Sequence, residues 1–388
     1  GNIANSTSPP MAVNAGSAVR LHIVMDCGDG CGEKLEQGFG VSGTPAMATA
    51  GKPIGLKVYV TDSNYNLVNT VSTAAVLVES FYASGGAEFN VKGTTKAIDA
   101  GVASWVPEVD GPIIFTARPD AKIKATLVDP ITLSPLSGAY SADTESSVFV
   151  ATTAAFNKLI VRFSNDQTLK PGQWDNQTNP NDTDSWFACA SPYTLCGKSI
   201  GTQPGSKSVG NSYPVEIIAT DRYYNSVSTN PQVLLLPSGA PNIFNEIIEG
   251  QPIQTLQNGS TIYNMLFKVA DNATGRYWTA IHISSAVAST RSPNVIVNPQ
   301  TSPKKIVLLL PGECLAPGSA LGKLGSPDED GMADESVEGC LTGKGNGVQN
   351  FIAGKAIRYK IRLTDDYFNP KSDVDTTIQL TSLDPNDT

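Results

Sequence analysis

The sequence is poor in charged, aromatic and histidine residues. Of its 388 residues 16% are charged and 7% are aromatic, only 2 are His, and the net charge is -9. This acidic balance argues against nucleic acid as a partner, because phosphates require basic patches. No apolar run reaches the roughly 18 residues that a transmembrane helix needs, so no membrane span is expected.

Catalytic motifs are also missing. The sequence contains no nucleophile elbow, phosphate-binding loop or histidine-rich metal cluster. His22 and His282 lie in separate strand-like segments, so no catalytic pair is expected. We therefore expect a protein that is not an enzyme. Gly1 starts no signal peptide, and the missing initiator Met predicts a processed or partial chain.

Turn-forming and β-forming residues are abundant instead. The chain has 35 Gly and 26 Pro, with many Thr, Ser, Val and Ile. This composition is typical of short strands joined by turns and leaves little room for long helices. The length allows two to three domains with proper cores.

One phrase occurs three times, at intervals of about 150 residues. Each copy has a Gly, an alternating strand, Thr-Asp, and then an aromatic residue and Asn at a fixed offset. The copies are residues 50–66, 209–225 and 353–369. Supersecondary units repeated at such intervals predict tandem modules, and they favour a scaffold over an enzyme.

The repeated strand is half-buried by its pattern, because apolar and polar residues alternate. The Asp and Asn that follow are expected to bond their own backbone in a turn. Around seven short strands per module predict an all-β fold of tandem Ig-like antiparallel β-sandwich modules, the last incomplete. Further strands are predicted at residues 75–78, 113–116, 123–127, 262–267, 277–282 and 377–380. The expected parts are 1–14 (final strand of a preceding module), 15–152 (module 1), 153–299 (module 2) and 300–388 (first part of module 3).

Several segments occur in an order that resembles a known family. These are Leu308-Leu309-Leu310-Pro311-Gly312-Glu313, Gly43-Thr44-Pro45, Ala353-Gly354 and Asp365-Asp366-Tyr367-Phe368-Asn369. They resemble the bacterial Ig-like repeats of very long cell-surface proteins over nearly the whole chain. The resemblance implies the fold and a surface location but no active site. The longer modules, the Cys pairs and the insertions depart from the family, so the role of the insertions stays open.

The six cysteines form three close pairs, one in each module. The pairs are Cys27 with Cys31, Cys189 with Cys196, and Cys314 with Cys340. Their even number and modular placement favour disulfides in an oxidising compartment, over free buried thiols. Zinc at the first pair is disfavoured, because only two cysteines are close together there.

An acidic insertion at residues 326–338 is the sharpest chemical signal. Its oxygen ligands are spaced along a loop, as calcium prefers, and a solvated acidic loop is the alternative. The calcium candidates are Asp328, Asp330, Asp334 and Glu338. Glycosylation candidates are Asn176 and Asn181, which lie in a polar loop that we expect to be exposed. No other cofactor is expected.

The repeats predict a structural region of a microbial cell-surface or secreted fibre that acts as a spacer and self-associates. Two other classes stay open. One is an adhesin that binds a glycan or protein through insertions at 165–200 and 311–350. The other is a set of accessory modules of a secreted enzyme. Because module 3 is short, we expect these residues to be a piece of a longer array.

Overall fold

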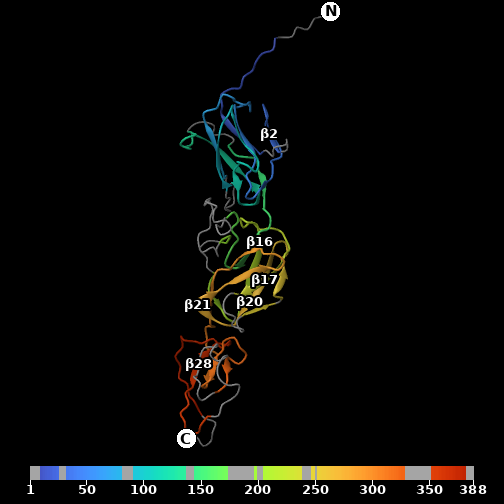
Figure 1. The fold of residues 1–388 in the computed structure, drawn as a ribbon. Helices are drawn as coiled ribbons and strands as arrows, with labels where there is room; N and C mark the ends of the chain where they lie inside the picture. The colour runs from blue at the N-terminus through green and yellow to red at the C-terminus, as the bar shows by residue number, and fades with distance from the viewer. Residues whose placement is uncertain are drawn as a thin grey trace, which may run out of the picture. The chain divides into compact units, whose positions relative to one another are not determined.

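The computed structural model describes residues 9–25, 32–80, 91–136, 144–173, 196–198, 204–237, 246–249, 251–327 and 351–381. These residues form strands and turns, with no helix among them (Figure 1). The all-β prediction is therefore confirmed for the part of the chain that is described. That part accordingly offers no helix long and apolar enough to cross a membrane.

The chain divides into two compact units. Unit 1 consists of Gly1–Lys158, Leu169–Ser199 and Ala219–Thr229. Unit 2 consists of Leu159–Thr168, Ile200–Ile218 and Asn230–Thr388. The module boundaries expected near 15, 153 and 300 stay predictions.

Unit 1 contains two three-stranded antiparallel sheets, ordered β1-β5-β9 and β12-β6-β8. Their strands are β1 (Arg20–Met25), β5 (Leu56–Thr61), β6 (Ala75–Ser80), β8 (Thr94–Ala97), β9 (Val102–Trp105) and β12 (Ile123–Val128). In β5, Leu56, Val58 and Val60 are completely buried and alternate with half-buried Lys57 and Tyr59. One hydrophobic core takes side chains from both sheets, so the alternation predicted from the sequence places the core between them.

Three smaller sheets complete unit 1, with the orders β11-β13-β4, β10-β7 and β2-β3. Their strands are β2 (Glu33–Glu36), β3 (Gly40–Gly43), β4 (Ala48–Thr49), β7 (Val91–Lys92), β10 (Ile113–Ile114), β11 (Arg118–Ala121) and β13 (Phe149–Thr152). The β13–β4 pair is parallel. Strand β4 is followed directly by Ala50 and Gly51, which begin the first copy of the repeated phrase.

The remaining strands lie wholly or mainly in unit 2. Their orders are β18-β20-β16-β14-β23, β19-β17-β22, β15-β24-β21, β25-β28 and β26-β27. They are β14 (Lys158–Phe163), β15 (Lys207–Ser208), β16 (Ser212–Thr220), β17 (Gln232–Pro237), β18 (Glu246–Glu249), β19 (Ile253–Thr255), β20 (Ser260–Phe267), β21 (Asp271–Arg276), β22 (Trp278–His282), β23 (Ala288–Thr290), β24 (Val295–Asn298), β25 (Lys305–Leu309), β26 (Glu313–Leu315), β27 (Lys323–Gly325) and β28 (Lys360–Thr364). Completely buried Trp278 contacts Phe163 and Phe267, with ring centroids 5.5 and 5.4 Å away. This aromatic cluster joins β22 of one sheet to β14 and β20 of another.

Most predicted strands are confirmed. The segments at 75–78, 123–127, 262–267 and 277–282 correspond to β6, β12, β20 and β22. The prediction at 377–380 is wrong, since these residues form no strand. Residues 9–14 form none either. A strand requires paired backbone groups, and neither segment belongs to a sheet in the part of the chain that is described.

Candidate functional site

The Asp-x-x-aromatic-Asn phrases form three turns with one hydrogen-bond pattern. We name them turn 1 (residues 62–66), turn 2 (221–225) and turn 3 (365–369). In each, Asp Oδ1 accepts the backbone N–H of the third and fifth turn residues, at 2.8 and 3.0 Å in turns 1 and 2 and 2.9 and 2.9 Å in turn 3. The fourth residue has a left-handed φ of 62°, 65° and 65° in turns 1, 2 and 3. The predicted bonding of Asp to its own backbone is confirmed, whereas the Asn side chain donates to the Asp carboxylate and not to backbone of the turn.

The second Asp oxygen binds the chain segment that leads into the opening strand. Asp62 Oδ2 accepts the Gly16 N–H at 2.8 Å. In turn 2 the Ala154 N–H donates at 2.9 Å, and in turn 3 the Gln300 N–H donates at 3.0 Å. Each Asp therefore ties the turn to the segment in front of its own sheet.

A cation from the opening strand covers the aromatic ring of each turn. Arg20 lies 4.8 Å from the centroid of Tyr65. Lys158 lies 4.6 Å from the ring of Tyr224 in turn 2, and Lys305 lies 4.0 Å from that of Phe368 in turn 3. Cation–π attraction strengthens when water is excluded, as at Lys158 and Tyr224, which are 2% and 0% exposed.

The Asn side chains of turns 2 and 3 bind backbone from a distant segment. Asn225 Nδ2 donates to the Phe115 carbonyl at 2.8 Å, and its Oδ1 accepts the Ala117 N–H at 2.7 Å. Asn369 repeats this pairing with the Lys268 carbonyl at 3.0 Å and the Ala270 N–H at 2.7 Å. Each carboxamide thus bonds the backbone carbonyl of one residue and the backbone N–H of the residue two positions later.

The third residue of these two turns packs on a glycine. A Cβ at Gly51 would lie 2.1 Å from the Tyr223 ring, and one at Gly210 would lie 2.8 Å from Tyr367. Both glycines also have positive φ, 80° and 84°. Tyr223 contacts Phe115 at a centroid distance of 5.1 Å. Only glycine leaves room for this close approach.

Turn 1 differs in its surroundings. The Asn66 side chain bonds Asp62, at 3.3 and 3.0 Å, and no distant backbone among the described residues is bonded to it. Asn66 is half-buried, whereas Asn225 and Asn369 are 2% and 1% exposed. Exposed Asn64 stands where turn 2 has Tyr223. Among the described residues, turn 1 therefore keeps the internal bonds, the bond to Gly16 and the contact with Arg20 but lacks the Asn-to-backbone pairing.

The covering of turn 2 changes the pKa of its Asp. In turn 1 the hydrogen bond from the Gly16 N–H, followed by that from the Asn66 side chain, lowers the pKa of Asp62 to about 2. In turn 2 burial outweighs the same kinds of bonds and raises the pKa of Asp221. Desolvation penalises the charged carboxylate, so identical turn chemistry gives opposite shifts.

Most sequence-predicted site residues lie outside the described part of the chain. These are Cys27, Cys31, Cys189, Cys340, Asp328, Asp330, Asp334, Glu338, Asn176 and Asn181. Cys196 and Cys314 are described, completely buried and disulfide-bonded. Their predicted partners are outside that part, so the pairing stays a prediction. Within the described ranges no group of three or more His, Cys, Asp or Glu could hold a metal ion.

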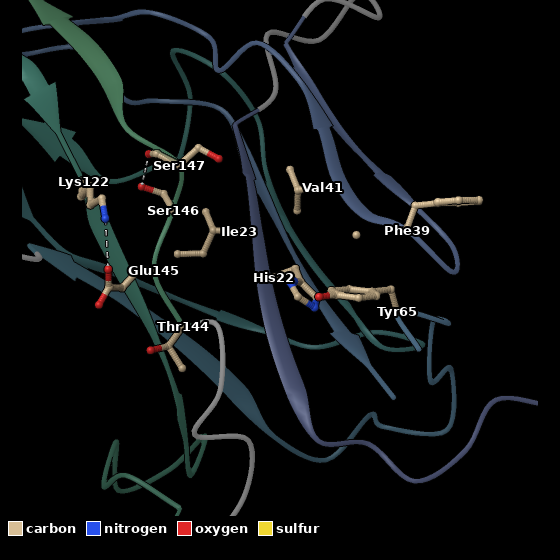
Figure 2. Close-up of a pocket in the computed structure, with 11 residues that line it drawn as sticks. His22, Ile23, Phe39, Val41, Tyr65, Lys122, Thr144, Glu145, Ser146 and Ser147 are labelled. Atoms are coloured by element: carbon tan, nitrogen blue, oxygen red, sulfur yellow. Dashed lines mark hydrogen bonds and ion pairs between the residues drawn. The ribbon is translucent and has the colours of Figure 1, made fainter. Parts of the chain in front are cut away.

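A hollow of about 680 Å³ opens in unit 1 beside β1 and the β2–β3 hairpin. Figure 2 shows His22 next to Tyr65, with ring centroids 5.0 Å apart, and Lys122 facing Glu145 across a 3.3 Å ion pair. Phe39 at the hairpin is 86% exposed. Ligand pockets are usually apolar with a few polar groups, whereas this hollow is walled largely by polar side chains. It carries no functional assignment.

No protein-family model matches the sequence, and a search of curated proteins gave no match. Among solved structures, the Escherichia coli adhesin FdeC is 13% identical, with 77% of this chain and 70% of that chain covered and a TM-score of 0.27. A β-glycosidase from Bacteroides vulgatus is 11% identical over 72% of this chain and 25% of its own, with a TM-score of 0.22. The calcium-binding domain CBD12 of CALX1.1 is 11% identical over 61% and 77%, with a TM-score of 0.18. At these identities and TM-scores the likenesses carry no argument about function.

Proposed function

We propose that this chain is a non-catalytic structural region of a microbial cell-surface or secreted fibre. In this proposal tandem Ig-like β-sandwich modules act as a spacer and assembly scaffold. The observation that carries it is the repeated Asn-to-backbone pairing, in which the carbonyl bound by Asn lies 110 residues earlier in turn 2 and 101 residues earlier in turn 3. We call this pairing of an Asn side chain with a distant backbone segment the joint. The joint is therefore built twice from the same residue types.

The chemistry of this joint suits a spacer. A carboxamide that accepts and donates at once fixes the orientation of the backbone segment that it binds. The bonds are buried, so breaking them would leave polar groups unsatisfied at a cost of about 1–3 kcal/mol each. Tyr223 on Gly51 adds an aromatic contact at the same place. Bending at such a joint would break all these contacts together.

The proposed location is extracellular or on the cell surface, with self-association as the expected partnership. The disulfide-bonded Cys196 and Cys314 favour an oxidising compartment. Calcium at the acidic insertion would rigidify that loop and belongs to the same proposal. Binding of a glycan or protein through the insertions remains the alternative.

The joint can be tested by pulsed electron paramagnetic resonance on the full chain. Nitroxide labels on unnatural amino acids at exposed Thr95 and Ser228, both in unit 1, would report one distance distribution. We expect a narrow distribution in the wild type and a broad one in Asn225→Ala. Asn66→Ala is the matched control, because Asn66 bonds only its own turn among the described residues, and it should leave the width unchanged.

A wild-type distribution as broad as that of Asn225→Ala would contradict the spacer function. Electron microscopy of native material tests assembly separately. Regular filaments or a lattice support the scaffold. Glycan binding that is lost when one insertion is deleted, without any regular assembly, would favour the adhesin instead.

A further inference from the structure

The loop between β19 and β20 contains the sequence Asn258-Gly259-Ser260. Asn followed two residues later by Ser or Thr is the acceptor sequence for an N-linked glycan, and it functions on the surface of a secreted protein. Five other acceptor sequences occur in the chain, beginning at Asn5, Asn176, Asn181, Asn272 and Asn386. Of the six acceptors, only Asn258 has a side chain within the described part of the chain.

The backbone of this loop holds Asn258 at its tip. Gln257 and Ser260 exchange two backbone hydrogen bonds, of 2.8 and 3.2 Å, which leaves Asn258 and Gly259 as a two-residue connection. These two residues have positive φ, 51° and 91°, as Asn-Gly commonly does in such tight connections. The Asn258 N–H also donates to Asn230 Oδ1 at 2.9 Å. The position of Asn258 is therefore fixed by its main chain and does not depend on its side chain.

The Asn258 side chain is exposed, and its carboxamide makes no hydrogen bond within the described ranges. Asn225 and Asn369 differ, because their buried carboxamides each bond distant backbone and an Asp carboxylate. A sugar on Asn258 Nδ2 would therefore break no hydrogen bond of the fold and would extend into solvent.

The cysteines favour the compartment in which N-linked glycans are added. Cys196 and Cys314 are disulfide-bonded, which is typical of secreted and cell-surface proteins. N-linked glycans are a modification of the same proteins. This step rests on the extracellular location in the proposed function.

We propose that Asn258 carries an N-linked glycan in the native protein. In the transfer, Asn258 Nδ2 forms a bond to the anomeric carbon of the first sugar, and the bond from that carbon to a lipid-linked diphosphate breaks. The diphosphate leaves with the bonding electron pair, and Nδ2 gives up one proton. The sugar donor and the transferase are supplied by the cell. Because a glycan is bulky and hydrated, it would keep other chains away from the β19–β20 loop.

Mass spectrometry of tryptic peptides from native material tests this proposal. Trypsin releases residues 223–268 as one peptide, since no Lys or Arg lies between Arg222 and Lys268, and this peptide contains no acceptor other than Asn258. We expect its mass to be increased by sugar residues that fragmentation places on Asn258. The chain produced in a host without the transferase is the control and should give the unmodified mass.

An unmodified peptide 223–268 from native material would overturn the proposal. The cysteines in the same sample show whether the proposed location fails with it. Disulfide-bonded cysteines beside an unmodified Asn258 would leave the extracellular location standing, whereas free thiols would contradict both.

Two variants made in the native host separate a sugar on Asn258 from one on a neighbouring hydroxyl. Asn258→Asp removes the acceptor nitrogen and should abolish the modification, while Asp tolerates positive φ as Asn does, so the loop should be kept. Ser260→Thr preserves the acceptor sequence and should retain the sugar. A sugar that persists in Asn258→Asp, or that is absent from Ser260→Thr, would show that the modification is not N-linked to this acceptor.

Discussion

At the scale of the residue, the Asp of the repeated turn shows how context sets the chemistry of one side chain. All three Asp residues accept two backbone N–H groups inside their turn and one from the preceding segment. Nevertheless the pKa of Asp62 is lowered and that of Asp221 is raised. The decisive difference is desolvation, since turn 2 is buried by the segments that its Asn and Tyr contact.

These shifts predict opposite effects of acid. The lowered pKa of Asp62 means that its contribution to folding is complete above pH 3.8 and is lost as the pH falls towards about 2. Asp62→Asn should therefore flatten the loss of unfolding free energy in this range. The raised pKa of Asp221 favours its protonated form in the folded state, so its removal in Asp221→Asn should steepen that loss. Urea unfolding at pH 2 to 5 measures the unfolding free energy of both variants. Equal slopes of this free energy against pH for the two variants would contradict the opposite pKa shifts of Asp62 and Asp221.

At the scale of the element, most of the strands predicted from the sequence are present, among them β5, β6, β12, β20 and β22. Val58 and Val60 in β5, for example, are buried as predicted. The alternation failed at 377–380, because it reports a face suited to burial and not the presence of a neighbouring strand. A local pattern of residues does not show whether another strand pairs with the segment.

The turn shows the same division between local and distant contacts. The bonds from Asp to backbone N–H groups of its own turn were predicted from the sequence. The bond from Asn225 to Phe115 joins residues far apart in sequence, so spacing alone could not reveal it. The available signal was the recurrence of Gly51 and Gly210 with the turns, because a repeated glycine marks close approach or positive φ.

Packing of turn 2 on Gly51 gives a prediction at this scale. Gly51→Ala places a Cβ 2.1 Å from the Tyr223 ring at a φ of 80°. The backbone strain costs about 1–2 kcal/mol, and overpacking adds about 1–3 kcal/mol. Gly38→Ala is the matched control, since Gly38 has a φ of 82° with nothing within 4 Å of the added Cβ. Thermal or urea unfolding should show the larger loss for Gly51→Ala, and equal losses would mean that the contact with Tyr223 is not maintained in solution.

At the scale of the whole molecule, the repetition of one joint matters more than any single site. Turns 2 and 3 carry the Asn-to-backbone pairing, which turn 1 lacks among the described residues. Under the proposed function, a pairing that recurs in this way would fix the backbone at two places in the same manner.

The proposed extracellular scaffold would gain covalent support from disulfide bonds, and the cysteines predict such bonds. Cys196 and Cys314 are completely buried and disulfide-bonded, and we expect Cys189 and Cys340 as their partners, with Cys27 joined to Cys31. Alkylation of the denatured chain without reductant should therefore add no mass, and six alkyl groups should appear after reduction. Closing the loop from Cys314 to Cys340 restricts the unfolded chain and should stabilise the fold by about 3 kcal/mol, so the pair of changes Cys314→Ser and Cys340→Ser should lower the free energy of unfolding by that amount. Six alkylated thiols in the unreduced protein would contradict both the pairing and the oxidising compartment that it implies.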